Sequence, residues 1–380
     1  MHRVQLLWLF CLLMLCQIAP ATKAAANSVL RNDVPIVAAR PLALRRASQS
    51  CSNDPTLASK AHTLAISGTL ALLGDYQALT ILDVSDPARP TCRSQVSVPT
   101  GVTGVQVRGD FAYLGIGSGP LGFGLEIFDI HDPDNPASQG IYNPSGVTDL
   151  AIAGNVLYLI TASSLVVLDI SNPTAPVLAS TYALNASATL KVVGKHLFVN
   201  NQSTYTFEIF DLADPLHPTK LGSFYQGTIG WYGFSVAGNR AYLLRSAGGV
   251  DVLDLSNPSN PVLTGTYTNI DMLDGYFHPT TNGIEVVGNR LYIADTRFQI
   301  YDLSSPTEAL LLASYDAPGA GHDMELIGQL AYIVNPEFGL KTGDYGFEII
   351  DISNQASPFL RGWFLNGSTG RFFYMQPIRR

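Results

Sequence analysis

The 380-residue sequence has few charged residues and no helical periodicity. Charged side chains make up 14% of the chain, against roughly 25% in an ordinary soluble protein, so few segments resemble the charged outer face of a helix. No segment repeats apolar residues at helical spacing over three turns. These absences argue against a stack of helical repeats, and the 34 glycines and 23 prolines supply many turns.

The sequence also lacks the short motifs of common catalytic and zinc sites. It contains no G-x-S-x-G, no H-E-x-x-H, and no Cys-x-x-Cys or Cys/His spacing typical of zinc. Residues 117–122 match the dinucleotide fingerprint by letter, but a predicted strand follows them where phosphate binding needs a helix N-terminus. We therefore favour a protein without enzymatic activity.

Long hydrophobic runs are absent except near the start of the chain. Leu6–Ile18 is too short to span a bilayer. It follows Arg3 and precedes Ala24 and Ala26, which are spaced for signal-peptidase cleavage. Residues 1–26 are therefore predicted to be a secretory signal peptide, which implies a secreted, periplasmic or cell-surface protein with no transmembrane span in the mature chain.

Charge and cysteine content agree with that location. The net charge of −8 would become −10 after loss of Arg3 and Lys23 with the signal peptide, which argues against nucleic acid as a partner. Two cysteines would remain, Cys51 and Cys92, in a compartment where disulfides persist. A bond between them would tie the segment before the repeats to the first repeat, and two unpaired thiols are the alternative.

One nonapeptide recurs seven times along the chain. LDVSDPARP at residues 82–90 returns as FDIHDPDNP, LDISNPTAP, FDLADPLHP, LDLSNPSNP, YDLSSPTEA and IDISNQASP. The copies lie 40 to 49 residues apart, a period that indicates an array of equal supersecondary units. The aspartate of the phrase falls at Asp83, Asp129, Asp169, Asp211, Asp254, Asp302 and Asp351.

Residues 149–184 show the unit most clearly. Four runs rich in Val, Ile, Leu and Tyr are separated by Gly-Asn, a small polar loop and an Asn-Pro turn, which is typical of a four-stranded antiparallel meander. The third run is apolar at almost every position in all seven copies, so both faces of each sheet must be covered. The sequence therefore predicts an all-β fold, a seven-bladed β-propeller of four-stranded antiparallel blades.

The predicted propeller occupies residues 61–366. Residues 27–60 form a lead-in segment that could add a latching strand, and residues 367–380 form a C-terminal tail. The predicted blades are about 61–98, 102–142, 147–183, 187–225, 231–267, 281–315 and 321–365.

The repeated aspartates follow the third strand of each copy, where Asp-Pro or Asn-Pro starts a turn. A carboxylate at this position can accept hydrogen bonds from the backbone N–H groups of the turn. Calcium ligation is the alternative. We favour the structural role because every blade needs this turn, whereas a binding site needs only one constellation.

The combined motif resembles a known family. The apolar-Asp runs LVVLDISNP and VDVLDLSNP are preceded by a G-[ND]-x-[AL]-Y pattern, as in GDFAYLG and GNRAYLL. Over about residues 62–364 the sequence is similar to the LVIVD-repeat proteins. That resemblance implies a bacterial or archaeal β-propeller, secreted or on the cell surface, and no defined catalytic residues. The last copy departs from the pattern, with Gln355 in place of the turn proline.

Antiparallel order places the first-to-second turns and the Asp-Pro turns on one face of the disc, the turn face. The second-to-third loops and the crossovers between blades fall on the other, the variable-loop face, where binding residues are expected because they concentrate on variable loops held by a rigid scaffold. Aromatic residues there could bind an extracellular protein or a glycan, or fold back over their own loops. The candidate binding residues are Trp231, Tyr232, Tyr276, Phe277, His278, Phe338 and Tyr345.

A second candidate site lies at the mouth of the central channel. Closure of the ring would make the first and last copies neighbours and bring His62 beside His322, with Asp323 adjacent. Imidazole and carboxylate groups could bind a divalent metal or act as an acid/base pair in a hydrolase or lactonase-like enzyme. They could equally be channel lining, and no other cofactor is expected.

Overall fold

The computed structural model describes most of the repeat region. The signal, lead-in and tail predictions fall outside the described residues, apart from Cys51. No helix long and apolar enough to cross a membrane occurs in the described part of the chain. All described residues belong to one compact unit, Ala38–Arg380. They are residue 51 and the ranges 61–98, 100–117, 124–142, 146–184, 188–227, 229–270, 283–295, 297–315, 321–335 and 346–365.

The described residues form seven sheets, each of four antiparallel strands in sequence order. Each sheet is one blade, numbered 1 to 7 along the chain. The strands are β1 (Thr63–Ser67), β2 (Leu70–Gly74), β3 (Ala78–Asp83), β4 (Thr91–Ser97), β5 (Val102–Arg108), β6 (Phe111–Ile116), β7 (Leu125–Asp129), β8 (Ala137–Tyr142), β9 (Val147–Ala153), β10 (Val156–Thr161), β11 (Ser164–Asp169), β12 (Val177–Ala183), β13 (Ala188–Val193), β14 (His196–Asn201), β15 (Thr206–Asp211), β16 (Thr219–Tyr225), β17 (Trp231–Ala237), β18 (Arg240–Arg245), β19 (Val250–Asp254), β20 (Val262–Tyr267), β21 (Ile284–Val287), β22 (Arg290–Ala294), β23 (Phe298–Asp302), β24 (Leu310–Tyr315), β25 (Asp323–Ile327), β26 (Leu330–Asn335), β27 (Gly346–Asp351) and β28 (Phe359–Leu365).

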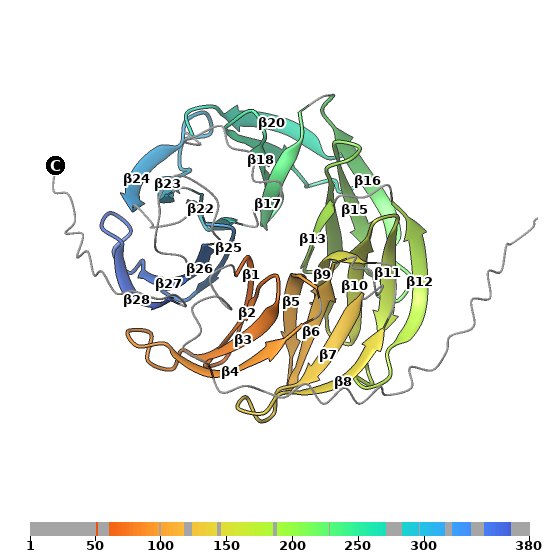
Figure 1. Ribbon diagram of the computed structural model, residues 1–380. Coiled ribbons are helices and arrows are strands. Elements are labelled where there is room, and N and C mark those ends of the chain that lie inside the picture. Colours follow the sequence, from red (N-terminus) through yellow and green to blue (C-terminus); the bar gives the residue numbers. More distant parts are fainter. Residues whose placement is uncertain are drawn as a thin grey trace, which may run out of the picture. The chain divides into compact units, whose positions relative to one another are not determined.

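The blades form a closed ring. The first strand of each blade lies near the centre and the fourth at the periphery (Figure 1). The inner strand of each blade contacts the next blade, through β14 and β17 between blades 4 and 5, and β1 contacts β25, so the last blade meets the first. The predicted all-β, seven-bladed propeller is therefore confirmed.

The hydrophobic core lies between neighbouring blades, which explains the apolar third strands. Leu165, Val166, Val167 and Leu168 of β11 are all buried, although they point alternately to the two faces of the sheet. Residues of blades 3 and 4 share one apolar cluster, and residues of blades 7 and 1 share another. Each blade is thus covered on both faces by its neighbours.

Each repeated aspartate holds the turn that follows the third strand. In all seven blades its Oδ1 accepts a hydrogen bond from the backbone N–H two residues later, at 2.6 to 3.1 Å. The backbone N–H of the residue directly after the aspartate, such as Val84, donates to a carbonyl in the first-to-second turn, here Thr69. The two kinds of turn therefore support each other on one face of the ring.

Every blade has a β-bulge where its fourth strand pairs with its third, followed by a residue no larger than serine. In several blades the turn of the next blade packs against this residue: Ser94 Oγ donates to the Pro133 carbonyl and Ser180 Oγ to the Leu216 carbonyl, both at 2.6 Å. Sequence reasoning missed this contact, although the small residue follows the turn aspartate at a constant spacing. These small residues are Ser94, Gly140, Ser180, Gly222, Gly265, Ala313 and Gly362.

Among the described strands, the first and last blades are each made of consecutive strands, blade 1 of β1–β4 and blade 7 of β25–β28. Side chains hold this joint. Asp323 Oδ2 accepts the Leu64 N–H at 3.0 Å and Glu325 Oε2 accepts the Ile66 N–H at 2.8 Å. At the periphery, Gly362 packs directly under the Pro87 carbonyl.

Gln355, which replaces the turn proline in the last copy, has a structural role of its own. Its Oε1 accepts a hydrogen bond from Arg290 Nε at 2.7 Å, and its Nε2 donates to the Tyr292 hydroxyl at 3.0 Å. The turn itself keeps its Ser353 N–H to Asp351 hydrogen bond. The substitution therefore replaces a rigid turn residue with a polar link between blades 6 and 7.

Candidate functional site

The two candidate histidines lie side by side at the joint between blades 7 and 1. His62 immediately precedes the inner strand of blade 1, and His322 that of blade 7. Their ring centroids are 5.8 Å apart in an edge-to-face arrangement, and the half-exposed Tyr76 ring lies 4.7 Å from that of His62. His322 Nδ1 is 2.7 Å from the His62 carbonyl oxygen, so this nitrogen is the protonated donor.

The carboxylate of Asp323 makes a hydrogen bond across the joint between blades 7 and 1. Its Oδ2 accepts the Leu64 N–H and its Oδ1 the Met324 N–H, both at 3.0 Å. Burial raises the pKa of Asp323 to about 6, and these hydrogen bonds and the nearby Lys191 oppose the rise. Within the described ranges, no three His, Cys, Asp or Glu side chains are arranged so that they could hold a metal ion.

Other inner strands carry carboxylates that the sequence reasoning did not single out. Asp149 Oδ2 accepts the Leu190 N–H of blade 4 at 2.8 Å, and Glu285 Oε2 accepts the Leu326 N–H of blade 7 at 3.2 Å. Burial raises the pKa of Asp149 to about 7, raises the pKa of Glu285 and lowers that of Lys191. The sequence does carry a signal for these groups, because each is a polar residue three or five positions before the glycine of the first-to-second turn.

Trp231 lies in the core. Its side chain is 1% exposed, and its indole Nε1 donates at 2.9 Å to Asp251 Oδ2, a carboxylate that is itself fully buried. Its ring faces are therefore closed to a ligand. Tyr232 is half-buried, and burial raises the pKa of its hydroxyl. The other predicted binding residues lie outside the described residues, namely Tyr276, Phe277, His278, Phe338 and Tyr345.

Cys51 and Cys92 are joined by a disulfide, with Cα atoms 6.0 Å apart. Cys92 lies on β4 and packs against the apolar cluster that blades 7 and 1 share. The disulfide thus anchors residue 51 beside the joint at which the ring closes.

The two faces of the ring differ in how uniform their connections are. On the turn face, every first-to-second turn has two residues and every third-to-fourth turn has seven, as in 68–69 and 84–90. On the variable-loop face, second-to-third loops range from two residues (162–163) to ten (336–345), and crossovers from four (98–101) to sixteen (268–283). Differences in length between the blades are confined to one face.

Comparison with known families agrees with this geometry. The LVIVD-repeat model matches residues 58–98, 101–144, 146–183, 233–269, 280–317 and 318–365, which is more than half of the sequence. The chain belongs to the LVIVD-repeat family. No LVIVD-repeat match covers the fourth blade, although β13–β16 form the same four-stranded sheet.

Among solved structures, this LVIVD-repeat chain resembles several propellers at low sequence identity. A protein from Lactobacillus plantarum has 12% identity and a TM-score of 0.58, with 79% of this chain and 93% of that chain covered. Sqt1 from Saccharomyces cerevisiae has 8% identity and a TM-score of 0.56, with 80% and 96% covered. BamB from Moraxella catarrhalis has 16% identity and a TM-score of 0.50, with 72% and 78% covered. At these identities the likeness shows the fold alone, and a comparison with curated proteins finds no match.

Proposed function

We propose that this protein is a non-enzymatic binding scaffold that engages a protein or glycan partner through its variable-loop face. The confinement of length differences to that face carries the proposal. A rigid ring that presents unequal loops on one side is the usual geometry of a recognition surface. Together with the signal-like residues 1–26, this arrangement supports a secreted, periplasmic or cell-surface location.

The polar groups of the channel support a structural role more than a catalytic one. Asp149, Glu285 and Asp323 each accept a backbone N–H of the next blade. A carboxylate that accepts a hydrogen bond from the backbone of the next blade is held in place by that contact and contributes to the joint between the blades. This favours binding over catalysis.

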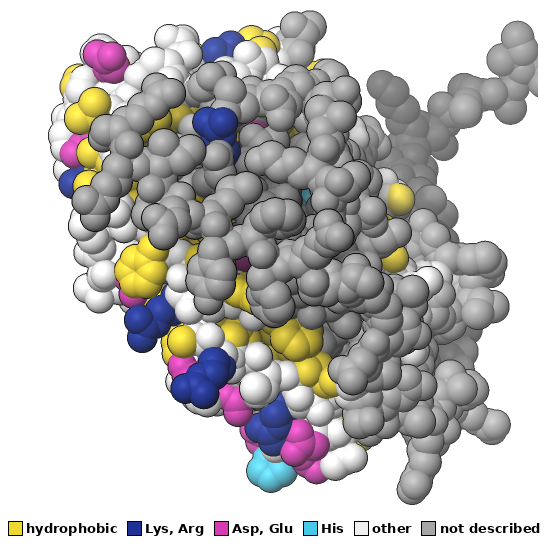
Figure 2. Space-filling view, turned by 60° about the vertical axis from the view of Figure 1, so that its left-hand side comes forward, with side chains coloured by type: hydrophobic (Ala, Val, Ile, Leu, Met, Phe, Trp, Pro, Cys, Tyr) yellow, Lys and Arg dark blue, Asp and Glu magenta, His cyan; other side chains and the backbone are white. Residues whose placement is uncertain are grey.

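The charge distribution fits a partner other than nucleic acid. The chain carries a net charge of −8. On the face shown in Figure 2, dark blue Lys and Arg side chains lie next to magenta Asp and Glu along the described margin, without a continuous basic stripe among them. Phosphate backbones are bound by clustered lysine and arginine, so a protein or glycan is the better match.

The test uses aromatic residues of the two faces. Tagless protein is screened on a glycan array and against proteins secreted by the source organism, together with the triple variant Tyr232→Ala/Tyr276→Ala/Phe338→Ala. The matched control is Phe359→Ala, an exposed aromatic at the turn end of β28. We expect a ligand whose affinity falls at least tenfold in the triple variant and is unchanged in the control. Equal loss in both variants, or no ligand that depends on the triple set, contradicts the proposal.

A metal-dependent hydrolase at the channel mouth is the second candidate, favoured by the adjacent rings of His62 and His322. Its test is elemental analysis of tagless protein dialysed against metal-free buffer. A near-stoichiometric transition metal that is lost in the His62→Ala/His322→Ala variant would make this the leading function. Background metal in both proteins would leave the two histidines as channel lining.

A further inference from the structure

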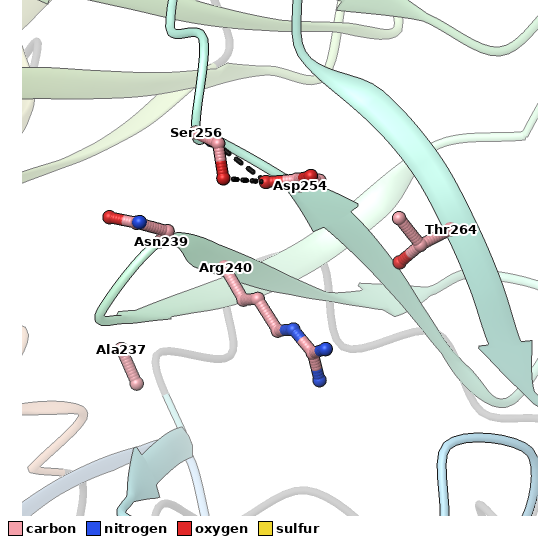
Figure 3. Close-up of a pocket in the computed structure, with 6 residues that line it drawn as sticks. All are labelled: Ala237, Asn239, Arg240, Asp254, Ser256 and Thr264. Carbon is pink, nitrogen blue, oxygen red and sulfur yellow. Dashed lines mark hydrogen bonds between the residues drawn. The ribbon is translucent and has the colours of Figure 1, made fainter.

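A cavity of about 270 Å³ opens on the turn face of blade 5. It lies between the first-to-second and third-to-fourth turns of that blade, opposite the variable-loop face (Figure 3). Six residues line it: Ala237, Asn239, Arg240, Asp254, Ser256 and Thr264. The site is therefore separate from the recognition surface proposed above.

Arg240 is the only cation among the lining residues, and its guanidinium points away from Asp254 and Ser256 (Figure 3). Its side chain is exposed and makes no hydrogen bond or ion pair with any residue in the described part of the chain. Asp254 Oδ1 accepts Ser256 N–H at 2.8 Å and Ser256 Oγ at 2.6 Å. These hydrogen bonds, and to a smaller extent the charge of Arg240, lower the pKa of Asp254.

Blade 6 provides an internal comparison. Arg290 holds the same repeat position, since it is paired in register with Asp302 as Arg240 is with Asp254. Arg290 Nη1 lies 2.8 Å from Asp302 Oδ2, and its Nε donates to Gln355 of the next blade at 2.7 Å. The arginine at this repeat position is thus bound by intramolecular partners in blade 6, whereas the side chain of its counterpart in blade 5 has no such partner among the described residues.

The loss of the partner from the next blade follows from one residue of the adjacent turn. Pro306 of blade 6 occupies the place that Gln355 occupies in blade 7, and proline has no side-chain acceptor to offer an arginine. Arg240 thus lines the cavity without a hydrogen bond from its guanidinium to any described residue.

We propose that this cavity binds the carboxylate of a partner protein through Arg240. A planar guanidinium matches a carboxylate with two parallel hydrogen bonds. A carboxylate fits better than a phosphate dianion because the cavity offers one cation and has the Asp254 carboxylate in its wall. Ala237 adds an apolar wall for the carbon atoms next to the carboxylate.

The test follows the Nε–H signals of 15N-arginine-labelled protein during titration with N-acetyl-L-alanine, with the neutral N-acetyl-L-alaninamide as the matched probe. The acid is expected to shift the Arg240 signal in a saturable manner while the Arg290 signal stays fixed and the amide has no effect. In Arg240→Gln, any remaining binding of the acid, followed by saturation-transfer signals of the ligand, should be at least threefold weaker. Arg290→Gln should bind as the unchanged protein does.

Three results would overturn the proposal. Equal shifts with the acid and the amide would show that the carboxylate is not recognised. Undiminished binding by Arg240→Gln would show that another group holds the acid. Tighter binding of inorganic phosphate than of N-acetyl-L-alanine would assign the cavity to a different anion. Because Arg240 is exposed, the variant should fold, and an unchanged thermal midpoint serves as the check.

Discussion

Replacing Gly362 with alanine should weaken the joint between blades 7 and 1. A Cβ at this buried position would overlap the Pro87 carbonyl oxygen and crowd Ala88, both of which are backbone atoms of the blade 1 turn. Backbone cannot swing aside as the end of a flexible side chain can, so the two blades must separate locally. Overpacking of this kind costs about 1–3 kcal/mol.

Gly265 gives a matched control in the same repeat position of blade 5. Its added Cβ would lie 3.8 Å from the Pro306 carbonyl oxygen, an ordinary contact. Neither Gly362 nor Gly265 has a positive φ, so the backbone conformation at both positions is acceptable for alanine. Gly265→Ala should therefore be neutral or stabilising by up to about 1 kcal/mol, through a less flexible unfolded chain.

The assay is urea denaturation combined with limited proteolysis. Gly362→Ala should lower the unfolding free energy by about 1–3 kcal/mol and direct early cleavage to β1 and β28, because no strand is exchanged between blades 7 and 1 in the described part of the chain. Gly222→Ala, with its Cβ 2.5 Å from the Pro258 carbonyl oxygen, should be destabilised without early cleavage there. If Gly362→Ala were as stable as Gly265→Ala, the packing argument would be refuted.

Three further predictions concern ionisable groups and the disulfide. Burial raises the pKa of Asp149 to about 7 and of Asp75 to about 6, so their contribution to stability is present at low pH and is lost as the pH rises through these values. The urea midpoint should therefore be higher at pH 5 than at pH 8. The difference between the two midpoints should be smaller in Asp149→Asn. Asp169→Ala removes a turn acceptor and should lower the thermal midpoint slightly, whereas a calcium-dependent midpoint in the unchanged protein would favour the calcium alternative. Cys92→Ser opens the link across a sequence separation of 41 residues and should lower the unfolding free energy by at most about 4 kcal/mol, which a non-reducing denaturation series would measure.

The blades could be predicted because their signals are local. An apolar third strand, a Gly turn and an Asp turn recur within each copy, and burial on both faces follows from composition alone. The adjacency of His62 and His322 also followed, since closure of the ring places the first copy beside the last.

The partners of side chains across the blades could not be predicted in the same way. The sequence predicts Trp231 on a binding loop, but it is the buried first residue of β17 and its indole donates to the buried Asp251. The sequence pattern alone does not show which way this side chain points. The acceptor role of Asp149 depends on the Leu190 N–H of the next blade. Such contacts depend on how two blades are rotated against each other, which strand periodicity does not encode.

The turn face is uniform for a mechanical reason, and this reason explains where the chain can differ between repeats. Each seven-residue turn closes its own hairpin, and several also pack on a small residue of the preceding blade, as Pro133 does on Ser94. A change of length there would disturb two blades at once, whereas loops on the opposite face carry no such constraint. The turn face can therefore differ only in its side chains, and the exchange of Gln355 for Pro306 is the kind of difference that leaves Arg240 open to a ligand.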